Sequence, residues 1–298
     1  MKKTGSFRIV MLIVVAFMLI TAAGCANKKA DANTREETGE KPIVAVSIVP
    51  QQTFVEAVCG DLAEVITMVP PGSSPENYEP TPKEMEQFSN AKVYFTIGVP
   101  TEEANILPKA EEISDLEIVS LQDDVAKVYP DRELAPGERD PHIWLSPKRA
   151  IVMVQSIAHE MEKIDPTNKD QYEENAQSYI TELEDLDGQI HTALAGVENR
   201  KFIVFHPAFG YLADDYGLEM YALEEEGKES TPQKMQELID LAKKENIKAI
   251  FYQAEISSSQ AEAFAEEIGG KTVQLAPLAP NYIENLKNMA TLMSEVMQ

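Results

Sequence analysis

The sequence has very few cysteines and few basic residues for its length. Of its two cysteines, Cys25 lies near the N-terminus and only Cys59 lies in the rest of the chain. A disulfide within the folded body is therefore excluded, so stability has to come from hydrophobic cores. Lysine and arginine total 26 against 50 aspartates and glutamates, which gives a formal net charge of -24. This balance argues against nucleic acid as a partner, because phosphate binding needs clustered basic residues.

Long hydrophobic runs are scarce as well. One apolar stretch, residues 9–20, follows a basic N-terminus and precedes a segment of small residues that ends at Cys25. This order is typical of a secretory signal peptide, and the stretch is short for a membrane span. We expect residues 1–24 to be removed as a signal peptide.

The residues around and after Cys25 predict a membrane anchor. The Ala-Gly pair before Cys25 resembles a bacterial lipoprotein box, in which this cysteine becomes the lipidated first residue of the mature chain. The alternative is an ordinary cleaved signal with an incidental cysteine. Residues 25–41 are rich in lysine and glutamate and have no hydrophobic period, so we expect a flexible tether. A lipid on such a tether would hold the folded part at the outer face of the membrane.

From residue 42 onward, apolar strand-like runs alternate with amphipathic helical ones. Strands alternating with helices predict parallel βαβ units and therefore the α/β class. The expected strands of the first half are residues 43–49, 63–69, 93–97 and 116–120, with helices at 54–58, 83–88 and 102–113. Those of the second half are 202–205, 219–223, 249–252 and 272–275, with helices at 211–216, 233–245, 259–268 and 283–297.

A long polar helix is expected between the two halves. Residues 167–195 contain no proline and only Gly188, and most of their circumference is polar. This pattern predicts a partly exposed strut rather than a core element. The expected fold is therefore two α/β lobes with parallel sheets, residues 42–164 and 198–298, joined by one long rigid helix within residues 165–197.

Two histidines lie at sites where they could share a metal ion. His142 lies in a loop stiffened by neighbouring prolines, and His206 directly follows the apolar run 201–205 and precedes a proline. Because ligands of α/β sheets bind beyond the carboxyl ends of the strands, both histidines are placed to face the cleft between the lobes. The alternative is that each is a hydrogen-bonded structural residue. His159 and His191 lie in charged helical segments, and we expect them on the surface.

Three motifs occur in order along the chain: residues 69–72 with 78–82, residues 140–147, and residues 205–212. Together they resemble the motifs of a known family, the zinc- and manganese-binding receptor lipoproteins of bacterial ABC importers. The resemblance covers the chain from residue 42 to its end. It implies an extracytoplasmic, lipid-anchored, monomeric receptor that captures Zn²⁺ or Mn²⁺ and delivers it to an ABC transporter permease, without enzymatic activity.

The resemblance also implies a set of metal ligands. Glu76 occupies the position of the family's first ligand, a histidine, so the expected site is Glu76, His142 and His206. The alternative is that Glu76 points to solvent. A fourth ligand in the family is a late carboxylate, but Ala276 stands at the matching position and cannot ligate. Glu255 or a water molecule is expected to complete the site.

The expected donors favour zinc over manganese. Two imidazoles and one carboxylate suit Zn²⁺, whereas an added carboxylate would favour Mn²⁺. The segment 130–140 has no histidine, although zinc importers of the family often carry a histidine-rich loop there. Asp140 could orient the His142 ring as a hydrogen-bond acceptor, or could simply stabilise the loop. Trp144 is expected to pack beneath the loop as a core residue.

Two other classes of protein remain open from the residues alone. A zinc hydrolase also uses two histidines, a carboxylate and an open position, but the sequence has no His-Glu-x-x-His helix and no second acid beside the expected ligands to serve as general base. A surface adhesin or structural lipoprotein would use these histidines only for packing.

Overall fold

The computed structural model describes residues 41–224, 230–256 and 259–297. The predicted signal peptide, most of the predicted tether and the predicted lipidation of Cys25 lie outside these ranges. Residues 41–298 form one unit. Within the described ranges, no helix combines the length and the apolar character that crossing a membrane requires.

The first sheet contains four parallel strands in the order β2-β1-β3-β4. Its strands are β1 (Ile43–Val46), β2 (Glu64–Thr67), β3 (Val93–Thr96) and β4 (Glu117–Ser120). The central strands β1 and β3 are almost wholly buried, as expected for apolar runs covered on both faces. Its α-helices are α2 (Val49–Cys59), α3 (Pro82–Phe88), α4 (Leu107–Ala110) and α5 (Leu121–Ala126).

The second sheet repeats this architecture with the order β10-β9-β7-β8. Its parallel strands are β7 (Lys201–Val204), β8 (Glu219–Ala222), β9 (Ala249–Gln253) and β10 (Lys271–Leu275). Its helices are α8 (Gly210–Tyr216), α9 (Pro232–Lys244), α10 (Ser259–Glu267) and α11 (Tyr282–Val296). Together the two sheets confirm the prediction of two α/β lobes with parallel sheets.

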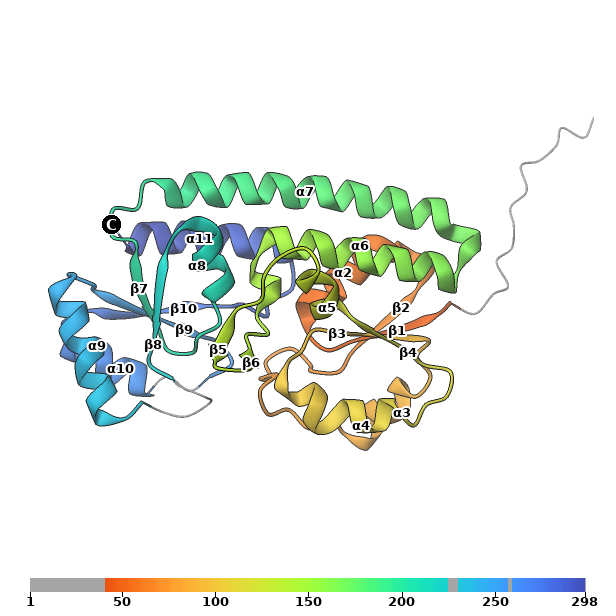
Figure 1. Ribbon diagram of the computed structural model, residues 1–298, viewed down its shortest axis with the longest axis horizontal. Helices are drawn as coiled ribbons and strands as arrows, with labels where there is room; N and C mark the ends of the chain where they lie inside the picture. The colour runs from red at the N-terminus through yellow and green to blue at the C-terminus, as the bar shows by residue number, and fades with distance from the viewer. Residues whose placement is uncertain (1–40, 225–229, 257–258, 298) are drawn as a thin grey trace, which may run out of the picture. The chain divides into compact units, whose positions relative to one another are not determined.

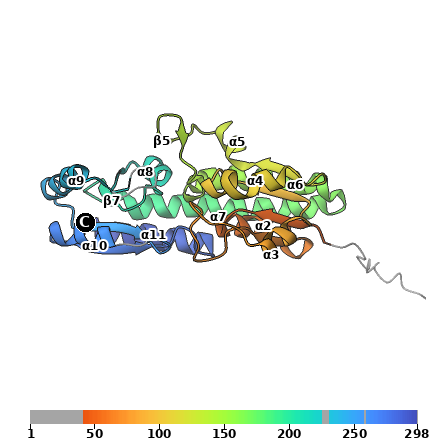
Figure 2. The same cartoon turned by 90° about the horizontal axis from the view of Figure 1, so that it is seen from below.

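Helices α6 (Pro147–Ile164) and α7 (Lys169–Ala195) connect the two sheets. Ser146 begins α6 as its N-cap, and its hydroxyl accepts a hydrogen bond from the Arg149 amide. Helix α7 runs past both lobes and packs against α2, α6 and α11 (Figures 1 and 2). The single long helix predicted between the lobes is therefore present.

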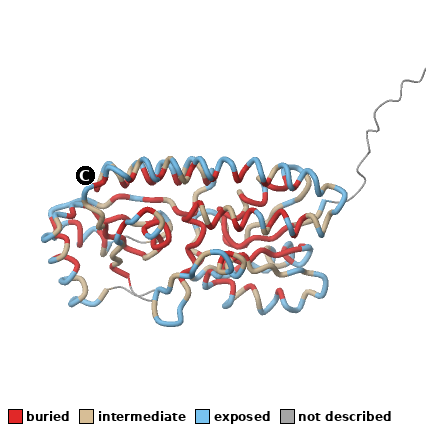
Figure 3. The backbone as a smooth tube through the Cα atoms, turned by 45° about the horizontal axis from the view of Figure 1, so that its top comes forward, coloured by how far each residue is buried: buried red, intermediate tan, exposed pale blue. Residues whose placement is uncertain are grey.

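The expectation that the long helix is no core element is wrong. One face of α7 is buried in the largest hydrophobic core, where Leu183, Leu186 and Ile190 are fully covered, while the opposite face is exposed (Figure 3). This face is hard to recognise in the sequence because polar and charged residues together outnumber the apolar ones around the helix. A narrow apolar stripe is nevertheless enough for helix packing.

The structure also contains elements that the sequence pattern does not reveal. The segment before His142 forms a short hairpin of β5 (Glu133–Ala135) and β6 (Glu138–Arg139), turning at Gly137 with a φ of 83°. Its strands are too short and polar to show alternation. The helix expected over residues 102–113 is instead a π-helical turn, Glu102–Ile106, followed by α4, which begins beside Pro108. Proline lacks the amide hydrogen that a continuous helix would use.

Candidate metal centre

His142 lies in the loop between β6 and α6 and is almost completely buried. Its backbone amide donates to Asp140 Oδ1 at 3.0 Å, and its ring Nδ1 lies 2.8 Å from the same oxygen. The Trp144 ring packs 5.1 Å away between centroids and is buried, as expected for a core residue. Asp140 therefore fixes the orientation of the imidazole, and Nε2 is the ring nitrogen left for another partner.

His206 lies two residues beyond β7, at the carboxyl edge of the second sheet. Its Nδ1 lies 3.0 Å from Glu224 Oε2. Val204 pairs with Ala222 in the parallel register, so His206 and Glu224 follow their strands at the same offset. The Glu224 amide donates to the Phe205 carbonyl at 2.8 Å, which continues the pairing past the strands.

Glu224 is a site residue that the sequence reasoning missed. The signal was present as an acid directly after the predicted strand 219–223. Recognising it requires the pairing of β8 with β7, because only that register places the acid beside His206.

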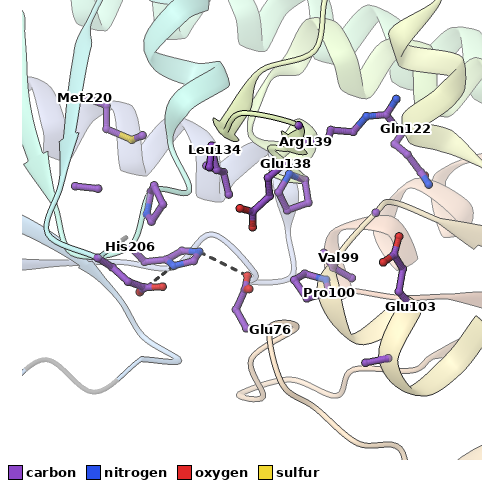
Figure 4. Close-up of a pocket in the computed structure, with 18 of the residues that line it drawn as sticks. Glu76, Val99, Pro100, Glu103, Gln122, Leu134, Glu138, Arg139, His206 and Met220 are labelled. Atoms are coloured by element: carbon purple, nitrogen blue, oxygen red, sulfur yellow. Dashed lines mark hydrogen bonds and ion pairs between the residues drawn. The ribbon is translucent and has the colours of Figure 1, made fainter. Parts of the chain in front are cut away.

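Glu76 reaches the same place from the first sheet, in the loop that follows β2. This loop is held by the π-helical turn: the Thr101 amide donates to the Pro75 carbonyl at 3.1 Å, and Asn105 Nδ2 donates to the Tyr78 carbonyl at 2.8 Å. Glu76 Oε1 lies 3.6 Å from His206 Nε2, with the side chain directed toward that ring (Figure 4). Glu76 therefore does not simply point to solvent, the alternative considered above, although 31% of its side chain is exposed.

The turn that holds Glu76 is itself fixed by a buried acid. The Glu102 carboxyl accepts hydrogen bonds from the Ile97 amide at 2.9 Å, the Gly98 amide at 2.8 Å and the Ser47 hydroxyl. Burial raises the pKa of Glu102 to about 7, and these hydrogen bonds work against that rise. The buried carboxyl thereby ties the loop after β3 to the end of β1.

Glu76, His142 and His206 form one cluster. One potential ligand atom from each lies within 4.8 Å of the others, and the two Nε2 atoms are 3.2 Å apart. Glu76 and His206 line a cleft of about 1310 Å³ together with Glu224, Glu138 and Arg139 (Figure 4). Of the two histidines expected to face the cleft, the buried His142 does not line it, although its neighbour Pro141 does. The residues in place can therefore offer two nitrogens and one oxygen to a cation that enters from the cleft.

Other positions considered for a fourth ligand are outside the cluster. Among the described residues, Glu255 is not a member of the group of close histidines and acids. Its half-buried carboxyl has a raised pKa because of desolvation.

The other two histidines of the chain, His159 and His191, are exposed on their helices, as predicted.

Comparison with known proteins gives a consistent family assignment. The family model described as "Zinc-uptake complex component A periplasmic" matches residues 44–296. The high-affinity zinc uptake system protein ZnuA of Bacillus subtilis (strain 168) is 30% identical over 281 residues, which cover 90% of this chain and 87% of that protein. The zinc-binding lipoprotein AdcA of Streptococcus pneumoniae (strain R6) is 29% identical over 87% of this chain and 54% of its own length.

Solved structures agree with this assignment. A crystal structure of ZnuA superposes with a TM-score of 0.82 at 36% identity and covers 87% of this chain and all of that one. The periplasmic zinc-binding protein TroA of Treponema pallidum, at 20% identity and a TM-score of 0.79, shares the fold. The family resemblance inferred from three motifs is confirmed, and a family of receptors removes the zinc-hydrolase alternative. The chain belongs to the zinc-uptake complex component A family, the extracytoplasmic metal-binding receptors of ABC uptake systems.

Proposed function

We propose that this receptor captures Zn²⁺ with Glu76, His142 and His206 and delivers it to an ABC transporter permease. The observation that carries the proposal is the 3.2 Å separation of the two histidine Nε2 atoms. Two donors in a tetrahedral zinc shell with bonds of about 2.0–2.1 Å are about 3.3–3.4 Å apart. The side chains thus already have nearly the spacing that a bound zinc ion requires.

The hydrogen bonds of the two rings support the same proposal. If each Nδ1 carries its proton toward a carboxylate, Asp140 for His142 and Glu224 for His206, both Nε2 atoms present lone pairs. Two lone pairs facing each other repel unless a cation or a proton lies between them. A metal ion satisfies both at once, and the carboxylates behind the rings increase the basicity of the ligating nitrogens.

The donor set favours zinc, with manganese as the alternative ion. Imidazole nitrogen suits Zn²⁺, and only one carboxylate joins the two rings. Relatives carry names for zinc and, in MtsA of Streptococcus pyogenes, for iron. We propose water as the fourth ligand, because Glu76 and His206 line the cleft and Glu255 is outside the cluster.

The N-terminal sequence supports the cellular part of the proposal. Lipidation of Cys25 would anchor the receptor to the outer face of the cell membrane, and residues 25–41 would act as the tether. We propose that the protein works as a monomer, since both histidines and Glu76 come from one chain. The adhesin alternative assumed that the histidines serve only for packing, whereas the two described rings direct their Nε2 atoms at one point.

Replacing His206 with alanine tests the proposed capture of zinc. We expect wild-type protein to bind one zinc ion per chain, and His206→Ala to bind about 100-fold more weakly or worse, a loss of roughly 2.7 kcal/mol. The measurement is competition calorimetry against a chelator of known affinity. His191→Ala, at an exposed histidine of α7, is the matched control and should bind as wild type. Equal affinity of His206→Ala and wild type would refute the site.

Changing Glu76 to histidine tests the role of the first ligand. Because imidazole is a better zinc ligand than a single carboxylate oxygen, Glu76→His should bind zinc more tightly and manganese more weakly than wild type. Glu79→His places the same side chain at an exposed position of the same loop and should change neither affinity. Both affinities can be measured by competition with a metal indicator. Weaker zinc binding by Glu76→His would mean that Glu76 does not occupy a ligand position.

Removing the charge behind His206 tests the contribution of Glu224. Glu224→Gln keeps an acceptor near Nδ1 but removes the negative charge that polarises the ring, so zinc affinity should fall about 10-fold. The control is Glu219→Gln, because Glu219 is an exposed residue at the start of β8, the strand that precedes Glu224. Titration calorimetry measures both. An unchanged affinity in Glu224→Gln would show that the contact with His206 does not support metal binding.

A further inference from the structure

The segment that carries His142 is held by a helix of the other lobe. Helix α8 follows β7 and His206, yet its Tyr211 contacts the chain on both sides of the β5–β6 hairpin. The Arg132 amide donates to Tyr211 Oη at 2.9 Å, and Tyr211 Oη donates to the Asp140 carbonyl at 3.1 Å. The base of the hairpin is thereby fixed to the helix that directly follows the second histidine.

The Arg132 side chain extends this attachment to the carboxylate behind His142. Its Nη1 lies 2.6 Å from Asp214 Oδ2 on α8, and its Nε lies 3.5 Å from Asp140 Oδ2. Asp140 is fully buried and uses its other oxygen, Oδ1, for the amide and ring of His142. A single guanidinium therefore connects α8 to the acceptor that orients the His142 ring.

The two atoms that face each other in this contact are complementary and otherwise unsatisfied. Arg132 Nε is a donor and Asp140 Oδ2 is an acceptor, both are buried, and neither has a hydrogen-bond partner among the described residues. A buried carboxylate needs a compensating charge, because desolvation without one is costly. Arg132 is the cation that makes an ion pair with Asp140 beside the His142 ring.

Gly210, the first residue of α8, leaves the room that this ion pair occupies. A Cβ atom at this position would lie 2.9 Å from Asp140 Oδ2 and 2.9 Å from Arg132 Cζ, and closer still to Arg132 Nε. Real side chains do not tolerate such contacts, so any larger residue would have to displace the guanidinium. The absence of a side chain at Gly210 therefore allows Arg132 and Asp140 to form their ion pair beside α8.

We propose that Arg132 is a positioning residue of the metal site. It holds Asp140, and through Asp140 it holds the His142 ring at the ligand spacing from His206. The inference rests on the proposed function, because it concerns how tightly the same site binds zinc. Within the described part of the chain, Arg132 makes its ion pairs and hydrogen bonds with Asp140, Asp214 and Tyr211 and with none of the three proposed ligands. It acts by keeping the two Nε2 atoms at their ligand spacing before the ion arrives, which reduces the cost of ordering the site.

Arg132→Ala tests this role against a control that breaks an ion pair away from the cleft. Lys201→Ala removes a basic side chain that is exposed to the same extent as Arg132 and pairs with Glu245 at 2.9 Å. We expect Arg132→Ala to bind zinc about 10-fold more weakly than wild type, with Lys201→Ala within about twofold. Chelator competition gives the affinities, and thermal unfolding of the metal-free proteins reports their stability.

A spectroscopic reading separates positioning from a merely structural role. Co²⁺ bound in place of zinc has visible absorption bands that depend on ligand geometry. If Arg132 orients His142, these bands shift in Co²⁺-loaded Arg132→Ala and stay unchanged in Lys201→Ala. Arg132→Lys keeps the charge but lacks the planar fork that reaches Asp214 and Asp140 together, so its affinity should lie between those of alanine and wild type.

Gly210→Ala supplies a second variant in which Arg132 itself is intact. The added methyl should displace the guanidinium and reproduce the weaker zinc binding of Arg132→Ala. Combining the two changes should weaken binding no further than the stronger single change, because both act through the same contact. Additive losses in the double variant would show that Gly210 and Arg132 act independently and would overturn the proposed link.

The two proposals fail in different ways. Wild-type protein that binds no zinc would overturn the function and this inference with it. Wild-type protein that binds zinc while Arg132→Ala and Gly210→Ala match it in affinity and Co²⁺ spectrum would overturn the inference alone. If these variants unfold at lower temperatures but keep the affinity and the spectrum of wild type, Arg132 only stabilises the fold. That result would also contradict the proposed positioning role.

Discussion

The arrangement of the site depends on one contact, in which two imidazole rings present their Nε2 atoms to each other. The separation of 3.2 Å is set from behind, where each ring has its Nδ1 against a buried carboxylate. Because these hydrogen bonds fix the orientation of both rings, the two Nε2 atoms remain directed at the same point, where a cation can bind. Glu76 adds an oxygen 3.6 Å from the His206 nitrogen and makes the pair a three-donor cluster. Capture of a divalent metal ion follows from this constraint more directly than from any other feature.

The fold supplies these groups from the carboxyl edges of two parallel sheets. Glu76 follows β2 of the first sheet, while His206 and Glu224 follow neighbouring strands of the second. His142 belongs to neither sheet and comes from the loop before α6, which is attached to α8 through Tyr211 and the hairpin. The histidine pair is therefore organised mainly around one lobe, and Glu76 approaches it from the other. Helix α7 packs against α2 of the first lobe and α11 of the second, and so connects the two contributions.

Much of this could be predicted from the sequence, and the misses have physical reasons. The alternation of apolar strands and amphipathic helices predicted the eight parallel strands that the structure describes, because each strand coincides with a short cluster of apolar residues. Prolines beside His142 and a strand end beside His206 marked both histidines. Glu224 was missed because its position depends on which strand neighbours β7, and Arg132 because its partners lie eight and eighty-two residues away along the chain. The buried face of α7 was missed because its apolar stripe is narrow.

The central claim is that both histidine rings bind one metal ion, and X-ray absorption at the zinc edge tests it most directly. For protein loaded with one equivalent of zinc, the account predicts a shell of about four nitrogen and oxygen neighbours at about 2.0–2.1 Å. It also predicts the outer-shell scattering of two imidazole rings, reduced to one ring in His206→Ala. A spectrum without imidazole scattering, or one identical in wild type and His206→Ala, would contradict the account.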